Sequence, residues 1–140
     1  MIDFQGKAIL VTGGTSGIGL ETARKILEAG GNVIITGRTL STLESAEASL
    51  AETQPDAPQR VLSVQSDTAD LQAIDPLLEQ IVGRFARLDG VFVNAGIGIF
   101  KPLADLTVED FDKLVAINLR GLFFTIQKAV PVMNDGGSIL

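Results

Sequence analysis

A short apolar run that ends in a cluster of glycines limits what this chain can fold into more than any other feature of its sequence. Residues 7–12 read Lys-Ala-Ile-Leu-Val-Thr, and the glycine-rich segment 13–19 follows at once. Continuous apolar runs of this length are typical of strands buried on both faces of a parallel sheet. Residues 17–29 then repeat apolar side chains at helical spacing, so the sequence predicts a strand, a tight turn and a helix.

The alternation of strand and helix continues along the rest of the sequence. Strands that alternate with helices form a parallel sheet with helices on both faces, joined by right-handed crossovers. We therefore predict a single α/β domain over residues 1–140, a doubly wound parallel sheet of Rossmann type, truncated in the fifth strand and so incomplete. The predicted strands are 7–12, 32–36, 61–65, 89–93 and 138–140, and the predicted helices are 17–29, 41–52, 71–85 and 107–130.

Three local signals set the expected element boundaries. Ser41 with Glu44 three residues on is the pattern of a capping box, which predicts the start of the second helix. Thr107 with Asp110 gives a weaker signal of the same kind for the last helix. The two prolines of segment 55–58 predict a loop before the third strand.

Composition excludes several classes of function. The 140 residues carry 11 basic and 17 acidic side chains, a net charge of −6, which argues against binding to nucleic acid or to an anionic membrane. The sequence has no cysteine and no histidine, so we predict no disulfide and no metal site. The N-terminus lacks the pattern of a signal peptide, and no apolar run approaches the roughly 20 residues that span a bilayer, so we expect a cytoplasmic protein.

The glycine-rich turn predicts a phosphate-binding loop. Glycines let backbone N–H groups approach a ligand closely, and the N-terminus of the following helix adds free donors and partial positive charge. The alternative is a tight strand-to-helix turn that uses glycine for its shape alone. The residues predicted to bind a dinucleotide here are Gly13, Thr15, Ser16, Gly17, Ile18 and Gly19.

The spacing of these glycines resembles that of the classical short-chain dehydrogenase/reductase family. The family motif is Thr-Gly-x-x-x-Gly-Ile-Gly, and residues 12–19 match every fixed position. The resemblance covers the whole chain and implies a nicotinamide cofactor and hydride transfer between the nicotinamide and an alcohol or ketone. Further matches are Asp67-Thr68, Asn94-Ala95-Gly96, Asn118 and Gly137-Ser138-Ile139, each in the family's order along the chain.

The resemblance also implies roles for the residues that follow the third and fourth strands. Asp67, with Thr68 beside it, belongs next to the adenine; the alternative is a loop aspartate that caps the helix from Leu71. Ala95 and Gly96 let the backbone lie against the cofactor ribose. Asn94 is able to bridge neighbouring strands through its amide, which leaves a purely structural role open.

Asn118 is the one residue of the family's catalytic tetrad that the resemblance places in this chain. There it helps to hold a water in the proton relay. The alternative is a buried helix asparagine whose amide is satisfied by a neighbouring carbonyl.

The end of the second strand predicts which cofactor binds. NAD-binding Rossmann folds carry an acidic residue there for the adenosine ribose, but residues 36–39 read Thr-Gly-Arg-Thr. The guanidinium of Arg38 presents a fork of donors to the 2′-phosphate of NADP, and Gly37 leaves room for it. We therefore predict NADP(H); a solvated surface arginine is the alternative.

The catalytic serine, tyrosine and lysine of the family are missing from the sequence. It contains no tyrosine, so it holds no Tyr-x-x-x-Lys motif, and Ser138 lies too early to be the catalytic serine. We expect the 140-residue chain alone to be inactive. Two hypotheses follow: the NADP(H)-binding portion of an oxidoreductase for a small alcohol or carbonyl substrate, or a non-catalytic dinucleotide-binding or interaction module. In either case the helix 107–130 predicts a homo-oligomer, as in the family. A methyltransferase fits poorly, because its glycine loop differs.

Overall fold

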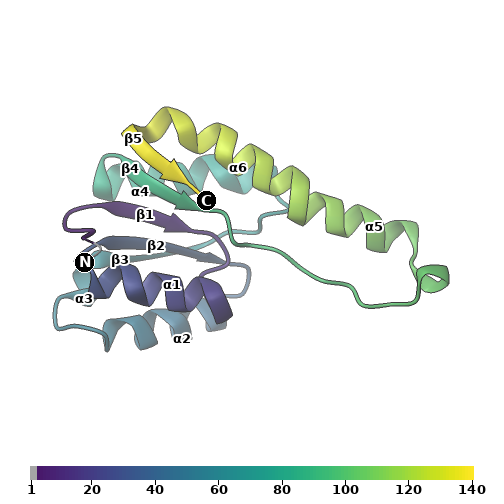
Figure 1. Ribbon diagram of the computed structural model, residues 1–140, viewed down its shortest axis with the longest axis horizontal. Coiled ribbons are helices and arrows are strands. Elements are labelled where there is room, and N and C mark those ends of the chain that lie inside the picture. Colours follow the sequence, from purple (N-terminus) through teal and green to yellow (C-terminus); the bar gives the residue numbers. More distant parts are fainter. Residues whose placement is uncertain (1–2) are drawn as a thin grey trace.

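The computed structural model describes residues 3–140 as one five-stranded sheet with helices on both faces (Figure 1). The strands lie in the order β3-β2-β1-β4-β5, and every neighbouring pair is parallel. This confirms the predicted doubly wound, Rossmann-type topology. The strands are β1 (Ala8–Val11), β2 (Asn32–Gly37), β3 (Val61–Gln65), β4 (Leu88–Phe92) and β5 (Met133–Ile139). The α-helices are α1 (Gly17–Glu28), α2 (Leu40–Ala51), α3 (Ala57–Arg60), α4 (Ile74–Phe85), α5 (Val108–Val115) and α6 (Leu122–Ala129).

The apolar strands form two cores because the side chains of a strand alternate between its faces. Leu10 and Ile34 are fully buried on one face, against the apolar side of α4 and Ala129 of α6. Val11 and Ile35 are fully buried on the other face, against α1 and α2. Burial on both faces explains why the central strands are apolar without interruption.

The order of the strands places a crevice at one edge of the sheet. From β1 the chain moves outward through β2 to β3, and α4 then returns it to β4 on the opposite side of β1. The loops that follow β1 and β4 therefore leave neighbouring strand ends in opposite directions. In open α/β sheets this switch point, at the carboxyl ends of the strands, is where ligands bind.

Two of the predicted boundaries before β3 are wrong. Helix α2 begins at Leu40, and its N-cap is Thr39, which has extended backbone and makes no capping bond through its side chain. Ser41 therefore lies inside the first turn, and the expected capping box with Glu44 does not form. The segment expected to be a loop contains the short helix α3, because Pro58 occupies its first turn, where no N–H is needed.

The last predicted helix is interrupted, although its start is confirmed. Thr107 and Asp110 form the expected capping box, in which the Thr107 hydroxyl accepts from Asp110 N at 3.1 Å. A π-helical turn, η3 (Ala116–Gly121), then separates α5 from α6, and a 3₁₀ turn, η4 (Val130–Val132), follows. Strand β5 begins at Met133 rather than Ser138, since a register shift against β4 lets the glycines of 136–137 join the strand.

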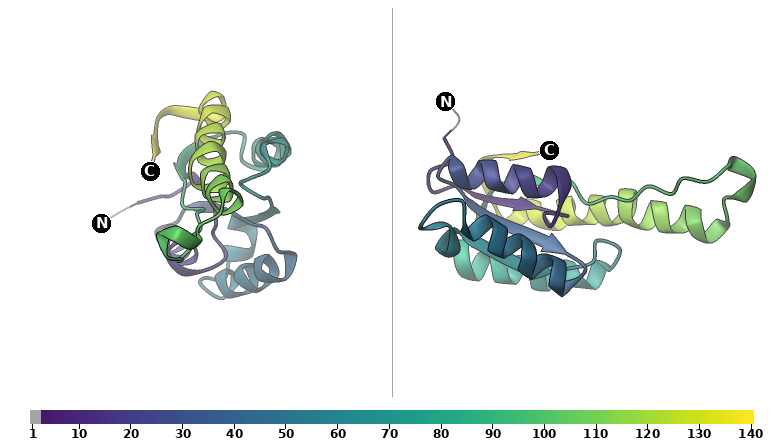
Figure 2. Two further views of the ribbon diagram at one scale, coloured as in Figure 1. Left: turned by 90° about the vertical axis from the view of Figure 1, so that its right-hand side faces the viewer. Right: turned by 90° about the horizontal axis from the view of Figure 1, so that it is seen from below.

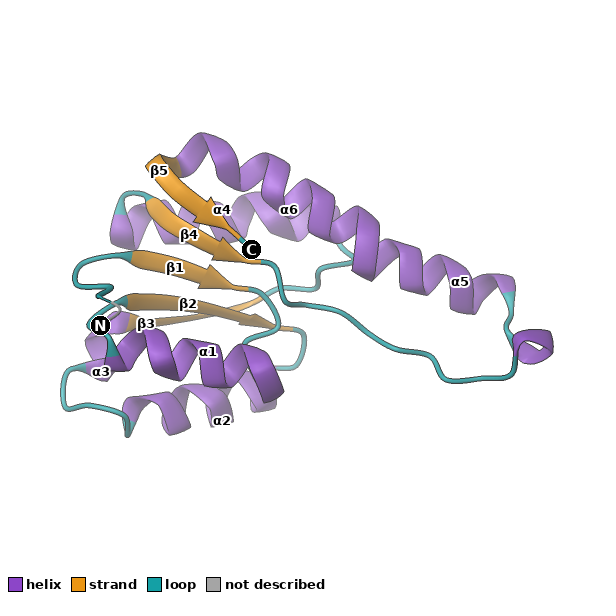
Figure 3. Ribbon diagram, viewed as in Figure 1, coloured by secondary structure: helices purple, strands orange, loops and turns teal. Residues whose placement is uncertain are grey.

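The chain between β4 and α6 projects away from the sheet. Figures 2 and 3 show a long loop after β4 that runs outward, a 3₁₀ turn, η2 (Leu103–Asp105), and α5 returning beside the loop. Phe100 is 98% exposed and Phe111 is 64% exposed, so this arm presents apolar side chains to solvent. Among residues 3–140, no helix has both the length and the apolar character needed to cross a membrane.

Candidate nucleotide-binding site

A cavity of about 260 Å³ lies at the switch point of the sheet. It is bounded by the turn after β1, the end of β2 and the loops after β3 and β4. Of the residues predicted to bind the dinucleotide, Gly13, Thr15, Ser16, Arg38, Thr68, Asn94, Ala95 and Gly96 line it. Thr36, Gly37, Ser66, Ile97 and Ile117 line it as well. The predicted residues Gly17, Ile18, Gly19, Asp67 and Asn118 are outside this lining.

Close approach of the backbone explains the glycines of the first turn. Gly13 has a φ of +64°, and a Cβ there would lie 3.0 Å from the Cα of Ala95 in the loop after β4. A Cβ at Gly19, in the first turn of α1, would lie 2.3 Å from the carbonyl oxygen of Gly13. The turn therefore packs closer to neighbouring protein atoms than a side chain at these positions allows, which is the shape role of the alternative interpretation, and phosphate binding stays a prediction.

The N-terminus of α1 opens onto this cavity without a side-chain cap. Ser16 is the N-cap and has extended backbone, but its hydroxyl makes no capping hydrogen bond. The first N–H groups of a helix have no partner within the helix, and together with the macrodipole they attract anions. Ile18, in the same turn, is 74% exposed, an unusual position for so apolar a side chain.

Asn94 joins the loop after β4 to the glycine turn. Its Nδ2 donates to the carbonyl oxygens of Thr12 and Gly13, at 3.1 Å each. The N–H of Ala95 donates to the hydroxyl of Thr12 at 3.0 Å, and Thr12 is almost fully buried. Asn94 thus bridges the loop after β4 and the glycine turn, as the structural alternative predicted. This bridge holds Ala95 and Gly96 at the wall of the cavity.

Asp67 does not cap the helix that follows it. Its Oδ1 accepts from the N–H of Ala69 at 2.9 Å, two residues on, within its own loop. The 3₁₀ turn η1 (Leu71–Ala73), which precedes α4, is capped instead by Asp70, whose Oδ1 accepts from Gln72 N at 3.0 Å. The helix-capping alternative for Asp67 is therefore wrong, and its role beside the adenine stays a prediction.

The side chain of Asn118 is fixed to the backbone of the loop after β4. Its Oδ1 accepts from the N–H of Ile97, and its Nδ2 donates to the carbonyl oxygen of the same residue, both at 2.8 Å. Asn118 lies in the π-helical turn η3, a rare conformation that is frequent at functional sites. Asn118 is exposed, so the buried position of the alternative interpretation is wrong, but its amide donates to a backbone carbonyl as that interpretation predicted.

Arg38 lies at the rim of the cavity with its guanidinium uncommitted. The side chain is exposed, and of the ion pairs formed among residues 3–140 none involves it. Its backbone is held in place, since Gln65 Nε2 donates to the Arg38 carbonyl oxygen at 2.9 Å. The strand end thus presents a cation to the cavity and no carboxylate.

Comparison with known proteins decides the family. The family model described as short chain dehydrogenase matches residues 7–140. The chain belongs to the short-chain dehydrogenase family. Levodione reductase of Leifsonia aquatica is 37% identical over 136 residues, and an NADP-dependent (R)-specific alcohol dehydrogenase of Lentilactobacillus kefiri is 36% identical over 133 residues. These matches cover 96% and 95% of the chain but only 50% and 51% of the relatives.

A solved short-chain dehydrogenase structure has the same fold. The crystal structure of a short-chain dehydrogenase/reductase from Brucella melitensis superposes with a TM-score of 0.91 at 26% identity. The match covers 99% of this chain and 57% of the other. The chain therefore spans about half the length of the relatives and structures that it matches.

Some residues that line the cavity were not among those predicted from the sequence. Thr36 is 3% exposed, and its hydroxyl accepts from the N–H of Gly13 at 3.3 Å. A threonine inside an apolar strand carries no functional signal of its own. Ile97 and Ile117 line the cavity because the bond between Asn118 and Ile97 draws η3 against the loop after β4, a contact between distant segments.

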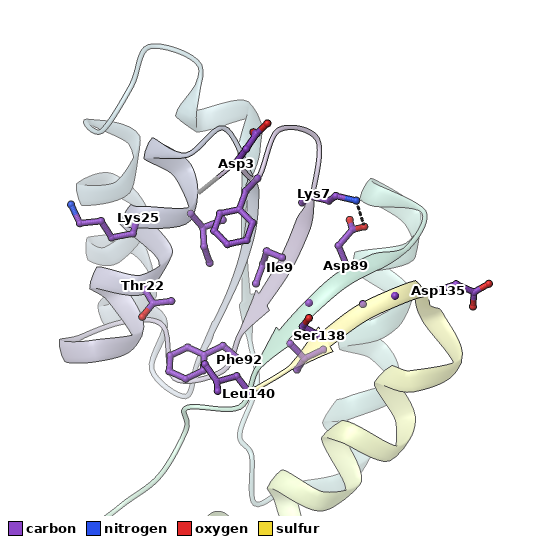
Figure 4. A pocket seen from close by; sticks show the side chains of 16 residues that line it. Asp3, Lys7, Ile9, Thr22, Lys25, Asp89, Phe92, Asp135, Ser138 and Leu140 are labelled. Carbon is purple, nitrogen blue, oxygen red and sulfur yellow. Dashed lines mark hydrogen bonds and ion pairs between the residues drawn. The ribbon is translucent and has the colours of Figure 1, made fainter. Parts of the chain in front are cut away.

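A second cavity lies elsewhere, beside α1 (Figure 4). It has about 410 Å³ and is formed by the α1 side of β1, β4 and β5, where Ile9, Phe92 and Leu140 give it an apolar floor. Lys7 and Asp89 form an ion pair at its edge, with Nζ and Oδ1 3.2 Å apart. This cavity marks a part of the sheet face that α1 does not cover.

Asp89 ties three strands together at this edge. Its carboxylate accepts from Ala8 N at 2.9 Å, from Asn134 Nδ2 at 3.0 Å and from Lys7 Nζ. Burial by itself raises the pKa of Asp89, but the hydrogen bonds from Ala8, Asn134 and Lys7 outweigh it and hold the pKa below its ordinary value. The folded protein therefore favours the charged carboxylate.

We expect Asp89 to make the protein less stable in acid. A carboxyl group whose pKa is lowered by folding stabilises the protein above its unfolded pKa, near 3.8, and this contribution is lost as the pH falls through the lower folded value. Asp89→Asn should lower the free energy of unfolding at pH 7 by about 1–2 kcal/mol and flatten its fall below pH 4. Urea denaturation between pH 2 and pH 7 measures both effects. Asp112→Asn, on the exposed side of α5, is the control, and an unchanged pH profile for Asp89→Asn would contradict the assignment.

Proposed function

We propose that these residues are the NADP(H)-binding portion of an oxidoreductase that transfers hydride between nicotinamide and an alcohol or carbonyl substrate. The observation that carries the cofactor assignment is the end of β2, where Gly37 and Arg38 line the cavity and no acidic residue stands. An arginine fork suits a phosphate monoester, while an NAD-binding site needs an acceptor for the ribose hydroxyls. The name of the Lentilactobacillus relative, an NADP-dependent dehydrogenase, agrees with this choice.

The residues at the switch point fit such a dinucleotide. The glycine turn, which leaves no room for side chains, and the uncapped N-terminus of α1 would hold the pyrophosphate. Arg38 would hold the 2′-phosphate, and Asp67 with Thr68 would lie beside the adenine. The backbone of Ala95 and Gly96 would face the ribose. When bound, the nicotinamide supplies or accepts the hydride.

In this proposal Asn118 acts as a positioning residue. Its paired bonds to Ile97 fix the loop that carries Gly96, and a Cβ on Gly96 would lie 3.4 Å from Asn118 Oδ1. The proton that accompanies hydride transfer requires another group, because the 140 residues contain no tyrosine. In the proposed activity of the whole protein, the family's serine, tyrosine and lysine would supply that group.

The arm after β4 would serve the substrate and a second copy of the chain. Ile97, Ile99 and Phe100 form an apolar segment next to the cavity, which suits a small-molecule alcohol or ketone. On the predicted oligomer helix, Phe111, Leu119 and Phe123 are each more than half exposed. Exposed apolar side chains on one helix are what a homo-oligomeric contact would cover.

Arg38→Asp tests the cofactor assignment. The substitution removes the proposed phosphate ligand and adds an acceptor for the ribose, so we expect the ratio of NADPH to NADH affinity to fall by about tenfold or more. Titration of the purified protein with each cofactor measures the ratio. Lys113→Asp makes the same change of charge on α5, away from the cavity, and should leave the ratio as it is. Equal ratios for wild type and Arg38→Asp would overturn the assignment of NADP(H).

A further inference from the structure

The space beside Gly37 is already filled by another residue of the cavity. A Cβ built on Gly37 would lie 2.5 Å from Cγ2 of Thr15, and 3.4 Å from Cγ of Leu43. Non-bonded carbon atoms in proteins do not lie 2.5 Å apart, so one of the two atoms would have to move. The backbone of Gly37 has a negative φ and belongs to β2, so the space available, rather than conformation, limits a side chain there.

The glycine turn holds Thr15 in this place through backbone hydrogen bonds. Gly14 N donates to the carbonyl oxygen of Thr36 at 3.0 Å, next to the bond from Gly13 N to the Thr36 hydroxyl. A Cβ on Gly14 would itself lie 2.7 Å from Cγ2 of Ile35, which shows how closely the turn rests on β2. Relief at position 37 therefore has to come from the side chain of Thr15, because the turn cannot move away from the strand without breaking these bonds.

We propose that Thr15 is a specificity-determining residue whose γ-methyl group opposes any side chain at the end of β2. This inference rests on the proposed binding of NADP(H). NAD-binding Rossmann folds place an acidic side chain at the end of the second strand, and the methyl group of Thr15 lies 2.5 Å from the position of that side chain's first atom, too close for both to fit. Arg38 attracts the 2′-phosphate, while Thr15 excludes the residue that would select the other cofactor. Arg38 thus acts on the ligand directly, whereas Thr15 acts through position 37, by keeping the acceptor for the other cofactor out of the site.

The chain offers a matched pair of substitutions at Thr15. Thr15→Ser deletes Cγ2 and keeps the hydroxyl, so a side chain at 37 gains room. Thr15→Val keeps a branched side chain of nearly the same shape, and a β-branched residue has few rotamers with which to avoid a neighbour. Each is combined with Gly37→Ala, which adds only the Cβ, and with Gly37→Asp, which adds the acceptor.

Thermal unfolding of the Gly37→Ala variants tests the contact without any cofactor. We expect Gly37→Ala to lower the midpoint in the wild-type and Thr15→Val backgrounds, and to lower it clearly less in the Thr15→Ser background. Equal decreases in the three backgrounds would show that Thr15 does not limit position 37 and would overturn the proposal.

Titration with NADH tests the consequence for specificity. Residues in contact couple by amounts that correspond to about twofold to more than a hundredfold in a binding constant. Gly37→Asp combined with Thr15→Ser should therefore bind NADH at least about fivefold more tightly than the product of the two single effects predicts, and Gly37→Asp with Thr15→Val should show no such gain. Additive effects of Gly37→Asp and Thr15→Ser would overturn the specificity role. If wild type bound NADH as well as NADPH, the proposed function would fail, whereas the Gly37→Ala series would still decide the contact.

Discussion

Gly121→Ala is expected to lower the free energy of unfolding by about 3 kcal/mol, the upper range for forcing an extra carbon into a packed site. A Cβ at Gly121 would lie 2.0 Å from the carbonyl oxygen of Thr68 and 2.8 Å from its carbonyl carbon. Both are backbone atoms, so no rotamer change relieves the contact. Gly121 has helical φ and ψ, which alanine adopts readily, and the loss comes from the close packing of η3 on the loop after β3.

Gly83→Ala is the matched control for this prediction. Gly83 is an exposed residue of α4, and a Cβ there would meet no atom within 4 Å. Alanine should raise the free energy of unfolding by about 0.5–1 kcal/mol, since it restricts the unfolded chain and favours the helix. Urea denaturation of the two variants beside wild type measures both values. Effects of the same sign would contradict the packing that the structure shows. Since Thr68 lines the cavity, Gly121→Ala should also weaken cofactor binding.

The second large effect is expected from Arg60→Ala, a loss of about 3 kcal/mol in the free energy of unfolding. The side chain of Arg60 is only 13% exposed. One terminal nitrogen donates to the carbonyl oxygens of Leu27 at 2.9 Å and Gly31 at 2.7 Å, and the other donates to Gln54 Oε1 at 2.8 Å. The guanidinium thereby satisfies carbonyls at the C-terminal end of α1, where a cation is favoured, and alanine would leave them without this partner.

The ion pair of Arg60 with Asp56 offers the control. Arg60 Nε and one of its terminal nitrogens donate to the two carboxylate oxygens, each at 2.9 Å. These bonds lower the pKa of Asp56, but the carboxylate is largely exposed. Exposed ion pairs contribute little to stability, so Asp56→Ala should destabilise far less than Arg60→Ala in the same urea denaturation experiment. A similar loss for both variants would assign the stabilisation to the ion pair instead of the carbonyl bonds.

The parts of the fold that the sequence predicts well are those with a strong local pattern. Strand β3 has the predicted bounds, because alternation between Val61 and Gln65 is bounded by a proline-rich segment and a polar loop. The glycine turn and Arg38 lie at the same cavity, as their positions after parallel strands predict. Local signals mislead where two neighbouring residues both predict the start of the same helix. Thr39 and Ser41 are both good N-cap residues, and only the backbone shows that the helix begins after Thr39.

The features that the sequence did not predict depend on contacts between distant segments. Arg60 reads as an ordinary charged residue near a loop, yet it binds the end of α1. The sequence does not distinguish Asp89 from the other acidic residues, because its hydrogen bonds form only where β1, β4 and β5 meet around it. The restriction of Gly37 by Thr15 depends on a glycine turn that folds back over β2. No periodicity or spacing encodes such distances.

The π-helical turn at Ala116–Gly121 joins the two helices that flank it. Each residue of an α-helix advances the chain by about 100° around the axis, and a π-helical turn accommodates one residue more than an α-helical turn. Since the turn takes up the extra residue within one turn, the loss of one residue here would return η3 to a regular α-helix and leave α5 and α6 with nearly the same relative rotation. The turn thus lets a difference of one residue in length be accommodated locally, at the residues around Asn118, without re-aiming the exposed arm or breaking the hydrogen bonds of α5 and α6.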